Sequence, residues 1–308
     1  MTKLKFAVFL CLLILPSLVF AWNIPGHMVS GALAYRELKA KDPKALSKVI
    51  ALLKKHPQYE QLFAPKLNNE NLSPEEKDLY LFMLAARWPD DIKSTSYEPK
   101  HNNWHYINYP FVNSSETALT IPKGDSVNIV SAYKYNLELL KSKASDEDKA
   151  IALCWVFHLV GDIHQPLHAT ALFSPELPEG DQGGNLLYVR AGEEGKAFTL
   201  HSFWDWLITG TQNFREADNR AVLLKNQQEF GRKNLKELKS KKFEKWAEKE
   251  SFLLAKTYAY MDEGLQTSTN REQALLLSQQ YIDAAKQVAE KRIVLAGYRI
   301  ADILCKVY

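Results

Sequence analysis

Apolar residues recur at helical spacing along most of the chain, and capping signals mark several of the places where these stretches begin. Asp42 followed by Pro43 is typical of a helix start, since aspartate is a favoured N-cap and proline fits the first helical position. Ser73 and Glu76 are spaced as in a capping box. Together these signals predict helices over residues 27–38, 42–55, 126–143, 146–162, 242–262 and 272–306, and a further helix after residue 73.

Strand signals are confined to one segment of the chain. NLLYVR and KAFTL, at residues 185–190 and 196–200, flank AGEEG and predict a β-hairpin. Hydrophobic residues make up 46% and charged residues 24%, as in a globular protein, and the length suits one large domain. The expected fold is therefore mainly α, a single domain with one small β-hairpin.

One stretch, WVFHLVGDIHQPLH, places polar residues in a regular pattern within an apolar predicted helix. His158 and Asp162 are four residues apart, so they share one face of that helix. Gly161 leaves room beside them for a close ligand, and Pro166 is expected to end the helix because proline lacks an N–H. His168 would then fold back toward the same point. Two imidazoles and one carboxylate converging in this way predict a site for zinc or a similar ion.

Other segments hold further histidines and carboxylates in similar local patterns. His201 and Asp205 repeat the four-residue spacing at the start of a probable helix, His105 lies in NWHYINYP, Asp90 ends a predicted helix, and His27 follows WNIPG. Each of these alone could be an ordinary core, turn or surface residue. Together with the central stretch they supply five imidazoles and at least three carboxylates, more than the four ligands that one zinc ion usually takes. Several zinc ions that share carboxylates are therefore expected.

The first 21 residues are typical of a secretory signal peptide. Two lysines precede an apolar run from Phe6 to Phe20, and Ala21 closes a plausible cleavage site. Cleavage there would leave one domain, residues 22–308, in a secreted or periplasmic protein without stable membrane association. The formal net charge of the whole chain is +3, so bulk charge does not attract nucleic acid. If the protein binds phosphate, a local site must do so.

The chain has 3 cysteines, of which Cys11 lies in the predicted signal peptide. Cys154 and Cys305 could form a disulfide in an oxidising compartment. Cys154 follows an apolar pattern beside Trp155, so a buried free thiol fits equally well. The fold is not expected to depend on a disulfide in either case.

The set of motifs, in this order, resembles the zinc-dependent single-strand-specific nucleases of the S1/P1 type. The resemblance covers most of the chain after residue 21 and rests on WNIPGH, RWPDDIK, NWHYINYP, HLVGDIHQPLHA, GDQGGNLLYVR, HSFWDW and AGYRIADIL. It implies the single-domain helical fold that these nucleases share with zinc-dependent phospholipases C, and three zinc ions in one cleft.

The resemblance also implies which residues hold each ion. Nine residues are divided among the three ions: Asp90, His105, His158 and Asp162 for the first; His168, His201 and Asp205 for the second; and the α-amine and carbonyl oxygen of Trp22, His27 and the bridging Asp162 for the third.

The activity implied by the resemblance is hydrolysis of single-stranded DNA and RNA to 5′-phosphorylated products, together with removal of the phosphate from 3′-mononucleotides. Paired zinc ions lower the pKa of water and so supply a nucleophile near neutral pH. Single strands are selected if an unpaired base must stack beside the metal site. The candidate stacking groups are Tyr106, Tyr109, Trp104 and Tyr188, and Asn185 of the GGN element resembles a substrate-binding amide. A monomer is expected.

The sequence departs from the family pattern at three places. Asn108 stands where fungal and plant members carry an aspartate thought to orient the attacking water, and Lys93 stands where many members carry an arginine thought to stabilise the transition state. We take both as candidate catalytic residues. Trp206 and Leu207 follow Asp205, where fungal members are more polar, so base preference is left open.

Two other interpretations fit parts of the pattern. A zinc-dependent phospholipase C acting on phospholipid head groups would share the fold and a three-zinc site. Those enzymes use glutamate where this chain has Asp205, and they lack the GGN hairpin. A secreted protein with structural zinc would hold each ion in a closed cage of four ligands, whereas shared carboxylates favour an open catalytic centre.

Overall fold

The computed structural model describes residues 22–69, 71–112 and 124–308, so the predicted signal peptide lies outside the described residues. The α-helices within these ranges are α1 Ile24–Lys41, α2 Pro43–Leu53, α3 Ala64–Asn69, α4 Pro74–Asp91, α5 Ile129–Lys141, α6 Asp146–Asp162, α7 Leu200–Asp205, α8 Phe214–Asn226, α9 Phe243–Lys245, α10 Phe252–Leu254 and α11 Gln279–Val307. The strands are β1 Tyr109–Val112, β2 Thr170–Phe173, β3 Tyr188–Arg190, β4 Phe198–Thr199 and β5 Leu275–Leu276. The predicted mainly α fold is confirmed.

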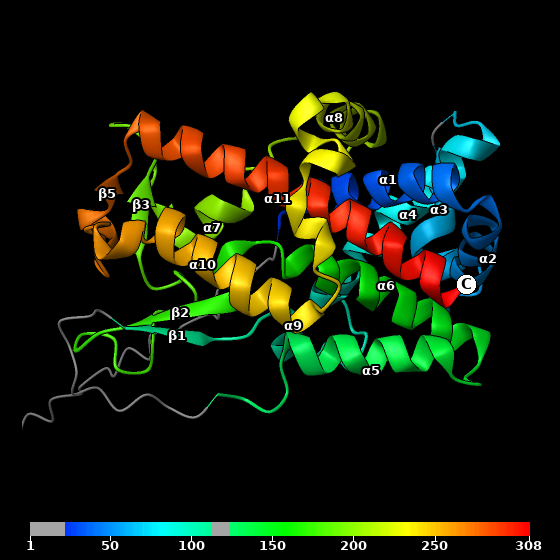
Figure 1. Cartoon of the computed structure of the whole chain (residues 1–308), viewed down its shortest axis with the longest axis horizontal. Helices are drawn as coiled ribbons and strands as arrows, with labels where there is room; N and C mark the ends of the chain where they lie inside the picture. Colours follow the sequence, from blue (N-terminus) through cyan, green and yellow to red (C-terminus); the bar gives the residue numbers. More distant parts are fainter. Residues whose placement is uncertain (1–21, 70, 113–123) are drawn as a thin grey trace, which may run out of the picture.

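Helix α1 lies at the centre of the packing (Figure 1). It contacts both α4 and α11 along its length, and α6 packs against α4 and α11. Glycine allows the closest approach, because a Cβ atom on Gly297 of α11 would lie 2.4 Å from Cβ of Leu33 in α1. A Cβ atom on Gly31 of α1 would likewise lie 2.7 Å from the carbonyl oxygen of Phe82 in α4. These tight contacts hold α1 against α4 and α11, and α1, α4 and α6 frame the candidate site.

The predicted helix starts are found where the capping residues indicated. Asp42 caps α2 by accepting a hydrogen bond from the Ala45 amide, and Ser73 and Glu76 form the capping box of α4. The bounds of α6 agree with the prediction of 146–162, with Ser145 as its N-cap. These short-range hydrogen bonds satisfy amide groups that have no partner inside the helix.

The sheets differ from the prediction. The expected hairpin is present, since β3 pairs antiparallel with β4, but β5 adds a third strand parallel to β3. A second sheet joins β1 and β2 in parallel. The expectation of one small hairpin was therefore incomplete. The added strands are two to four residues long and pair with distant segments, so they leave no alternating pattern in the sequence.

The late helical segments are more irregular than predicted. Residues 242–262 alternate between short α-helices and π-helical turns, η8 at Trp246–Ser251 and η9 at Ala255–Ala259. The wider turn η8 places Glu250 beside Arg292 and Arg299 of α11. The last helix begins at Gln279 rather than near 272, because a 3-10 turn and β5 precede it. Helix α8 was not predicted, although Asn213 is its N-cap.

The central stretch ends differently from the expectation. Helix α6 stops at Asp162, four residues before Pro166, so the proline does not end it. Pro166 instead opens the 3-10 turn η4, Pro166–Ala169, because the residue before a proline favours an extended backbone and Gln165 adopts one. Cys154 and Cys305 are free thiols, which excludes the disulfide alternative for this structure. The helices of the described part fall short of the length and apolarity that a membrane span requires.

Candidate metal centre

Five of the predicted ligands gather where three long helices meet. His27 comes from α1, Asp90 from the end of α4, and His158 and Asp162 from α6. His105 joins them from the 3-10 turn η3, Asn102–His105. We refer to these five residues as the first group. All of them are buried, with at most 3% of each residue exposed.

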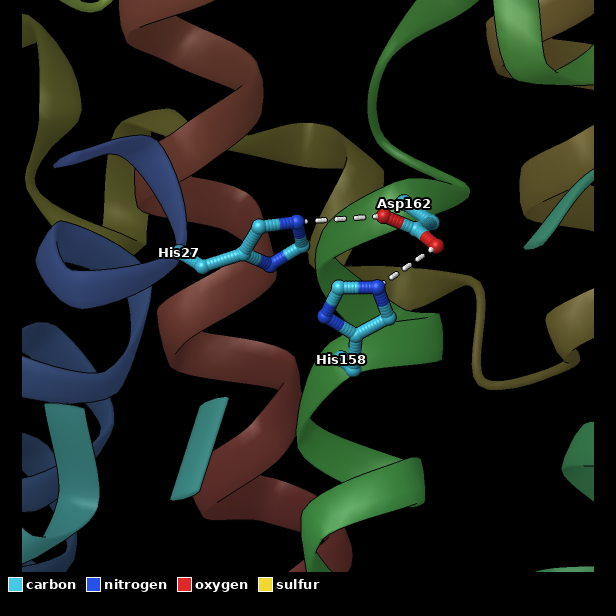
Figure 2. A group of neighbouring side chains, drawn as sticks. All are labelled: His27, His158 and Asp162. Atoms are coloured by element: carbon cyan, nitrogen blue, oxygen red, sulfur yellow. Dashed lines mark ion pairs between the residues drawn. The ribbon is translucent and has the colours of Figure 1, made fainter. Parts of the chain in front are cut away.

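Asp162 lies in the middle of the first group. Its carboxylate is 3.2 Å from Nε2 of His27 through one oxygen and 3.2 Å from Nε2 of His158 through the other, as Figure 2 shows. The second oxygen is also 2.9 Å from Nδ1 of His105. Asp90 faces the same space, with its oxygens 3.8 Å from His27 and 3.5 Å from His158. Each carboxylate therefore contacts several imidazoles.

Gly161 leaves the predicted space beside α6, and the imidazole of His27 occupies it. A Cβ atom on Gly161 would lie 2.9 Å from Nδ1 of His27, too close for the imidazole to stay in place. The His27 ring stacks on the His158 ring, with centroids 4.0 Å apart. A glycine at this position of α6 thus allows α1 to bring its histidine to Asp162.

His168, His201 and Asp205 form a second group. His201 and Asp205 lie on the short helix α7, one turn apart, and His168 lies on the 3-10 turn η4. Nε2 of His201 is 3.6 Å from one Asp205 oxygen, and Nε2 of His168 is 4.0 Å from the other. The residues are also buried, with at most 3% exposed.

Backbone carbonyl groups orient three of the imidazoles. His158 donates its Nδ1–H to the carbonyl of Ala86 at 2.9 Å. His168 donates its Nδ1–H to the carbonyl of His105, and His201 donates its Nδ1–H to the carbonyl of Gly183, both at 2.7 Å. A donor hydrogen at Nδ1 leaves Nε2 of a neutral ring with its lone pair. In each case Nε2 faces the carboxylates, the arrangement typical of metal-bound histidine.

The pKa values follow from burial and from the close charges. Burial, together with the Lys93 ammonium, lowers the pKa of His105 to about 3. Burial also lowers the pKa of His158, but Asp162 and Asp90 outweigh it and raise the value to about 10. Burial would raise the pKa of Asp162, yet His158 and hydrogen bonds from His105 hold it well below its usual range. The close opposite charges therefore favour the ionised form of both carboxylates in this group.

The second group has fewer compensating charges. Burial lowers the pKa of His168, and it lowers the pKa of His201 to about 3. Burial also raises the pKa of Asp205 well above its usual range, even though Gln165 donates a hydrogen bond to it. Neutral imidazoles are the form that binds metal. A bound cation would favour the ionised form of Asp205.

The unpaired polar atoms fit a metal. Within the described residues, Nε2 of His168, Nε2 of His201 and both ring nitrogens of His27 have no hydrogen-bond partner. Leaving a buried polar group without a partner costs about 1–3 kcal/mol. Nitrogen and carboxylate oxygen donors are the ligands that zinc prefers. The ligand atoms form three sets, each within 4.8 Å: His27, His158 and Asp162; Asp90, His105 and His158; and His168, His201 and Asp205.

Trp22 lies next to both groups. Its buried indole donates a hydrogen bond from Nε1 to the carbonyl of Gly161, at 2.9 Å, one residue before Asp162. The amide of Asn23 donates to the carbonyl of Asp205, at 3.2 Å. These two bonds hold the segment that precedes α1 between the groups.

The other predicted site residues occupy different surroundings. Lys93 is nearly buried, with Nζ 2.7 Å from Asp90. Asn108 is exposed and Tyr106 half-buried, and both line a cavity of about 440 Å³. The side chain of Asn185 donates to the carbonyl of Gln182, at 2.9 Å. Among the other candidate stacking residues, Trp104 already stacks on the His101 ring, so one face of its indole is covered.

Two residues that support the second group were not predicted. Gln165 is fully buried, donates from its amide to Asp205 at 2.8 Å, and accepts the amide N–H of Leu167 at 2.6 Å. Asp181 is also fully buried and accepts hydrogen bonds from Tyr260 and Leu172. Gln165 stands beside Pro166 between two histidines, and Asp181 stands two residues before the Gly183-Gly184 pair. Those neighbours were the only signals available in the sequence.

Comparison with known proteins gives a consistent result. The family model described as S1/P1 Nuclease matches residues 22–308. Nuclease S1 of Aspergillus oryzae is 25% identical over 75% of this chain and 80% of its own length. Endonuclease 5 of Arabidopsis thaliana is 26% identical over 78% of this chain and 82% of its own, and Endonuclease 1 of the same plant is 24% identical over 100% and 93%.

Proposed function

The chain belongs to the S1/P1 nuclease family, and from that premise we propose that it is a secreted or periplasmic zinc-dependent phosphodiesterase. It would hydrolyse single-stranded DNA and RNA to 5′-phosphorylated products and would also act as a 3′-nucleotidase. Family membership supports a nuclease as such. The choice of metal, strand and product is our proposal.

The observation that carries the proposal is the clustering of the eight buried histidine and aspartate side chains in three sets of ligand atoms, each within 4.8 Å. Asp162 faces His27 through one carboxylate oxygen and faces His105 and His158 through the other, so it can serve two neighbouring ions. Shared ligands are the arrangement expected of adjacent ions that act together on one phosphate, rather than of separate structural cages.

The proposed ligands follow the division implied by the sequence motifs. The first ion would bind Asp90, His105, His158 and Asp162, the second would bind His168, His201 and Asp205, and the third would bind the α-amine and carbonyl oxygen of Trp22, His27 and Asp162. The three ions, when bound, would polarise the phosphate and lower the pKa of water. The match of the family model begins at Trp22, which supports cleavage before that residue.

The remaining residues would act on the substrate. Lys93, held 2.7 Å from Asp90, would place its ammonium group near the phosphate and offset charge in the transition state. Tyr106 would stack against a base in the 440 Å³ cavity, and Asn185 would hydrogen-bond to substrate. Asn108, on the same cavity, would hydrogen-bond to the attacking water without removing its proton. A base that must enter a cavity has to be unpaired, which favours single strands.

The test is a zinc determination on protein that begins at Trp22, together with assays on matched single-stranded and double-stranded DNA. We expect about three zinc ions per chain, faster hydrolysis of the single strand, and products that carry a 5′-phosphate. A 3′-mononucleotide should release phosphate. Hydrolysis of phosphatidylcholine in place of DNA would identify a phospholipase, whereas full zinc with no turnover of either substrate would identify a structural site.

A further inference from the structure

The glycine loop before β3 contacts His201 of the second group directly and packs against Leu167, the residue before His168. The carbonyl of Gly183 accepts the Nδ1–H of His201 at 2.7 Å, and the carbonyl of Gly184 accepts the His201 amide at 3.2 Å. A Cβ atom on Gly183 would lie 2.6 Å from the carbonyl oxygen of Leu167, the residue before His168. The loop is thus pressed between the two ligand-bearing segments, and its conformation fixes the imidazole of His201.

This conformation requires an anchor. Gln182, Gly183 and Gly184 have φ of +55°, +64° and +84°, a run of left-handed residues that is unfavourable for a non-glycine residue such as Gln182. Such a backbone persists when the surroundings determine it. The residue that precedes the run is Asp181, which is fully buried.

Asp181 fixes the loop through hydrogen bonds to its carboxylate. Oδ1 accepts the amide of Leu172 in β2 at 2.8 Å, and Oδ2 accepts the hydroxyl of Tyr260 at 2.7 Å. The backbone amides of Gly183 and Gly184 also stabilise the ionised form of this carboxylate, which couples it to the loop. Its two hydrogen-bond donors come from outside the loop, from β2 and from Tyr260, so the carboxylate ties the loop to both.

Tyr260 links this anchor to the late helical part of the chain. It follows the π-helical turn η9, is 2% exposed, and packs its ring against Phe111 of β1, with centroids 5.5 Å apart. Its hydroxyl is the side-chain donor that reaches Asp181. A chain of contacts therefore runs from Tyr260 through Asp181 and the Gly183 carbonyl to Nδ1 of His201.

We propose that Asp181 and Tyr260 are positioning residues for the metal ion of the second group. They hold the Gly183 carbonyl so that His201 keeps its hydrogen on Nδ1 and turns Nε2 toward Asp205. The inference rests on the proposed function, since it takes the second group as a metal site. Groups that hydrogen-bond to a metal-ligating histidine, and so orient it, typically contribute 10–100-fold to metal affinity.

Asp181→Asn and Tyr260→Phe test the proposal in the full chain that begins at Trp22. Zinc affinity is measured by competition with a chromophoric chelator. We expect one of the three zinc equivalents to bind about 10–100-fold more weakly in each variant, with the other two unchanged. Nuclease activity should recover as free zinc is raised. Tyr133→Phe is the matched control, because Tyr133 of α5 is buried against Phe243 of α9. This variant should keep all three equivalents.

The outcomes separate the two proposals. A wild-type protein with three zinc ions whose variants keep wild-type affinity for every equivalent overturns this inference alone, even where the variants are less stable. Equal weakening of all equivalents also overturns it, because that result indicates a general structural role. A wild type that lacks the second zinc counts against the proposed function as well. If Asp181→Asn does not fold, Tyr260→Phe decides, since it keeps the ring packing.

Discussion

The first and second groups place the same kinds of side chain on very different supports. Four of the five residues in the first group lie on α1, α4 and α6, which are 17 or 18 residues long and packed in the core. The second group lies on α7, with 6 residues, and on the 3-10 turn η4, with 4. Packing of long helices fixes the first group, whereas Gln165, Asp181 and a glycine loop fix the second through hydrogen bonds.

The difference indicates where each half of the site is vulnerable. In the first group, Asp162 and Asp90 lie among the imidazoles and raise the pKa of His158 to about 10, even though burial lowers it. In the second group, Asp205 faces two imidazoles with low pKa values and depends on Gln165 for its hydrogen bond. The first group should therefore tolerate loss of a supporting residue better than the second, while loss of its central carboxylate should be more damaging.

Loss of Asp162 is expected to have the largest effect. Asp162→Asn removes a carboxylate that contacts His27, His105 and His158, so we expect loss of more than one zinc equivalent and of nearly all activity. Elemental analysis measures the zinc. Asp91→Asn is the matched control, because Asp91 pairs with Arg87 instead. Three zinc ions remaining in Asp162→Asn would contradict a bridging role.

An extra residue before Trp22 is expected to have the next largest effect. A protein that begins Met-Trp22 has an amide nitrogen where the α-amine would bind zinc, and an amide is a poor ligand. The free amine has a pKa of about 7.7–8.0, which bound zinc would lower further. We expect fewer zinc ions and strongly impaired cleavage relative to protein that begins at Trp22. Equal zinc content and equal rates in the two proteins would show that the terminus is not a ligand.

Removing Gln165 tests the hydrogen-bonded support of the second group. Gln165→Ala should weaken one zinc equivalent about 10–100-fold and leave the first group intact, because the amide contacts Asp205 and not Asp162. Chelator competition resolves the equivalents. Gln58→Ala, which removes the acceptor for the Trp88 indole, is the control for loss of a glutamine hydrogen bond elsewhere. Weakening of the other two equivalents would show that the groups are not independent.

The smallest effect is expected at Asn108. Since divalent ions themselves lower the pKa of water, we expect that a carboxylate at this exposed position is not required. Asn108→Asp should change the rate or the pH profile modestly without being needed for activity. The rate of single-strand cleavage by wild type and by Asn108→Asp, measured between about pH 4 and 9, tests this expectation. An inactive wild type that Asn108→Asp restores would show that the base is essential.

The sequence predicted the ligand residues of the site but not the residues that support them, for a physical reason. Spacing of four residues places His158 above Asp162, and His201 above Asp205, wherever the segment is helical, so local periodicity is sufficient. The role of Asp181 depends on Tyr260, 79 residues away, and on a backbone conformation that no periodicity encodes. The same reason explains why the capped helices were found and the short parallel strands were missed.

The bonds that surround the site join residues far apart in the chain. Trp22 reaches Gly161 across 139 residues, and His158 reaches Ala86 across 72. Contacts of such separation form late, because long loops must close before any contact compensates for their lost entropy. A growing chain cannot assemble the ligands until Asp205 and its supports have been synthesised. Under the proposed function, a chain that ends before Asp205 would therefore lack a complete set of metal ligands.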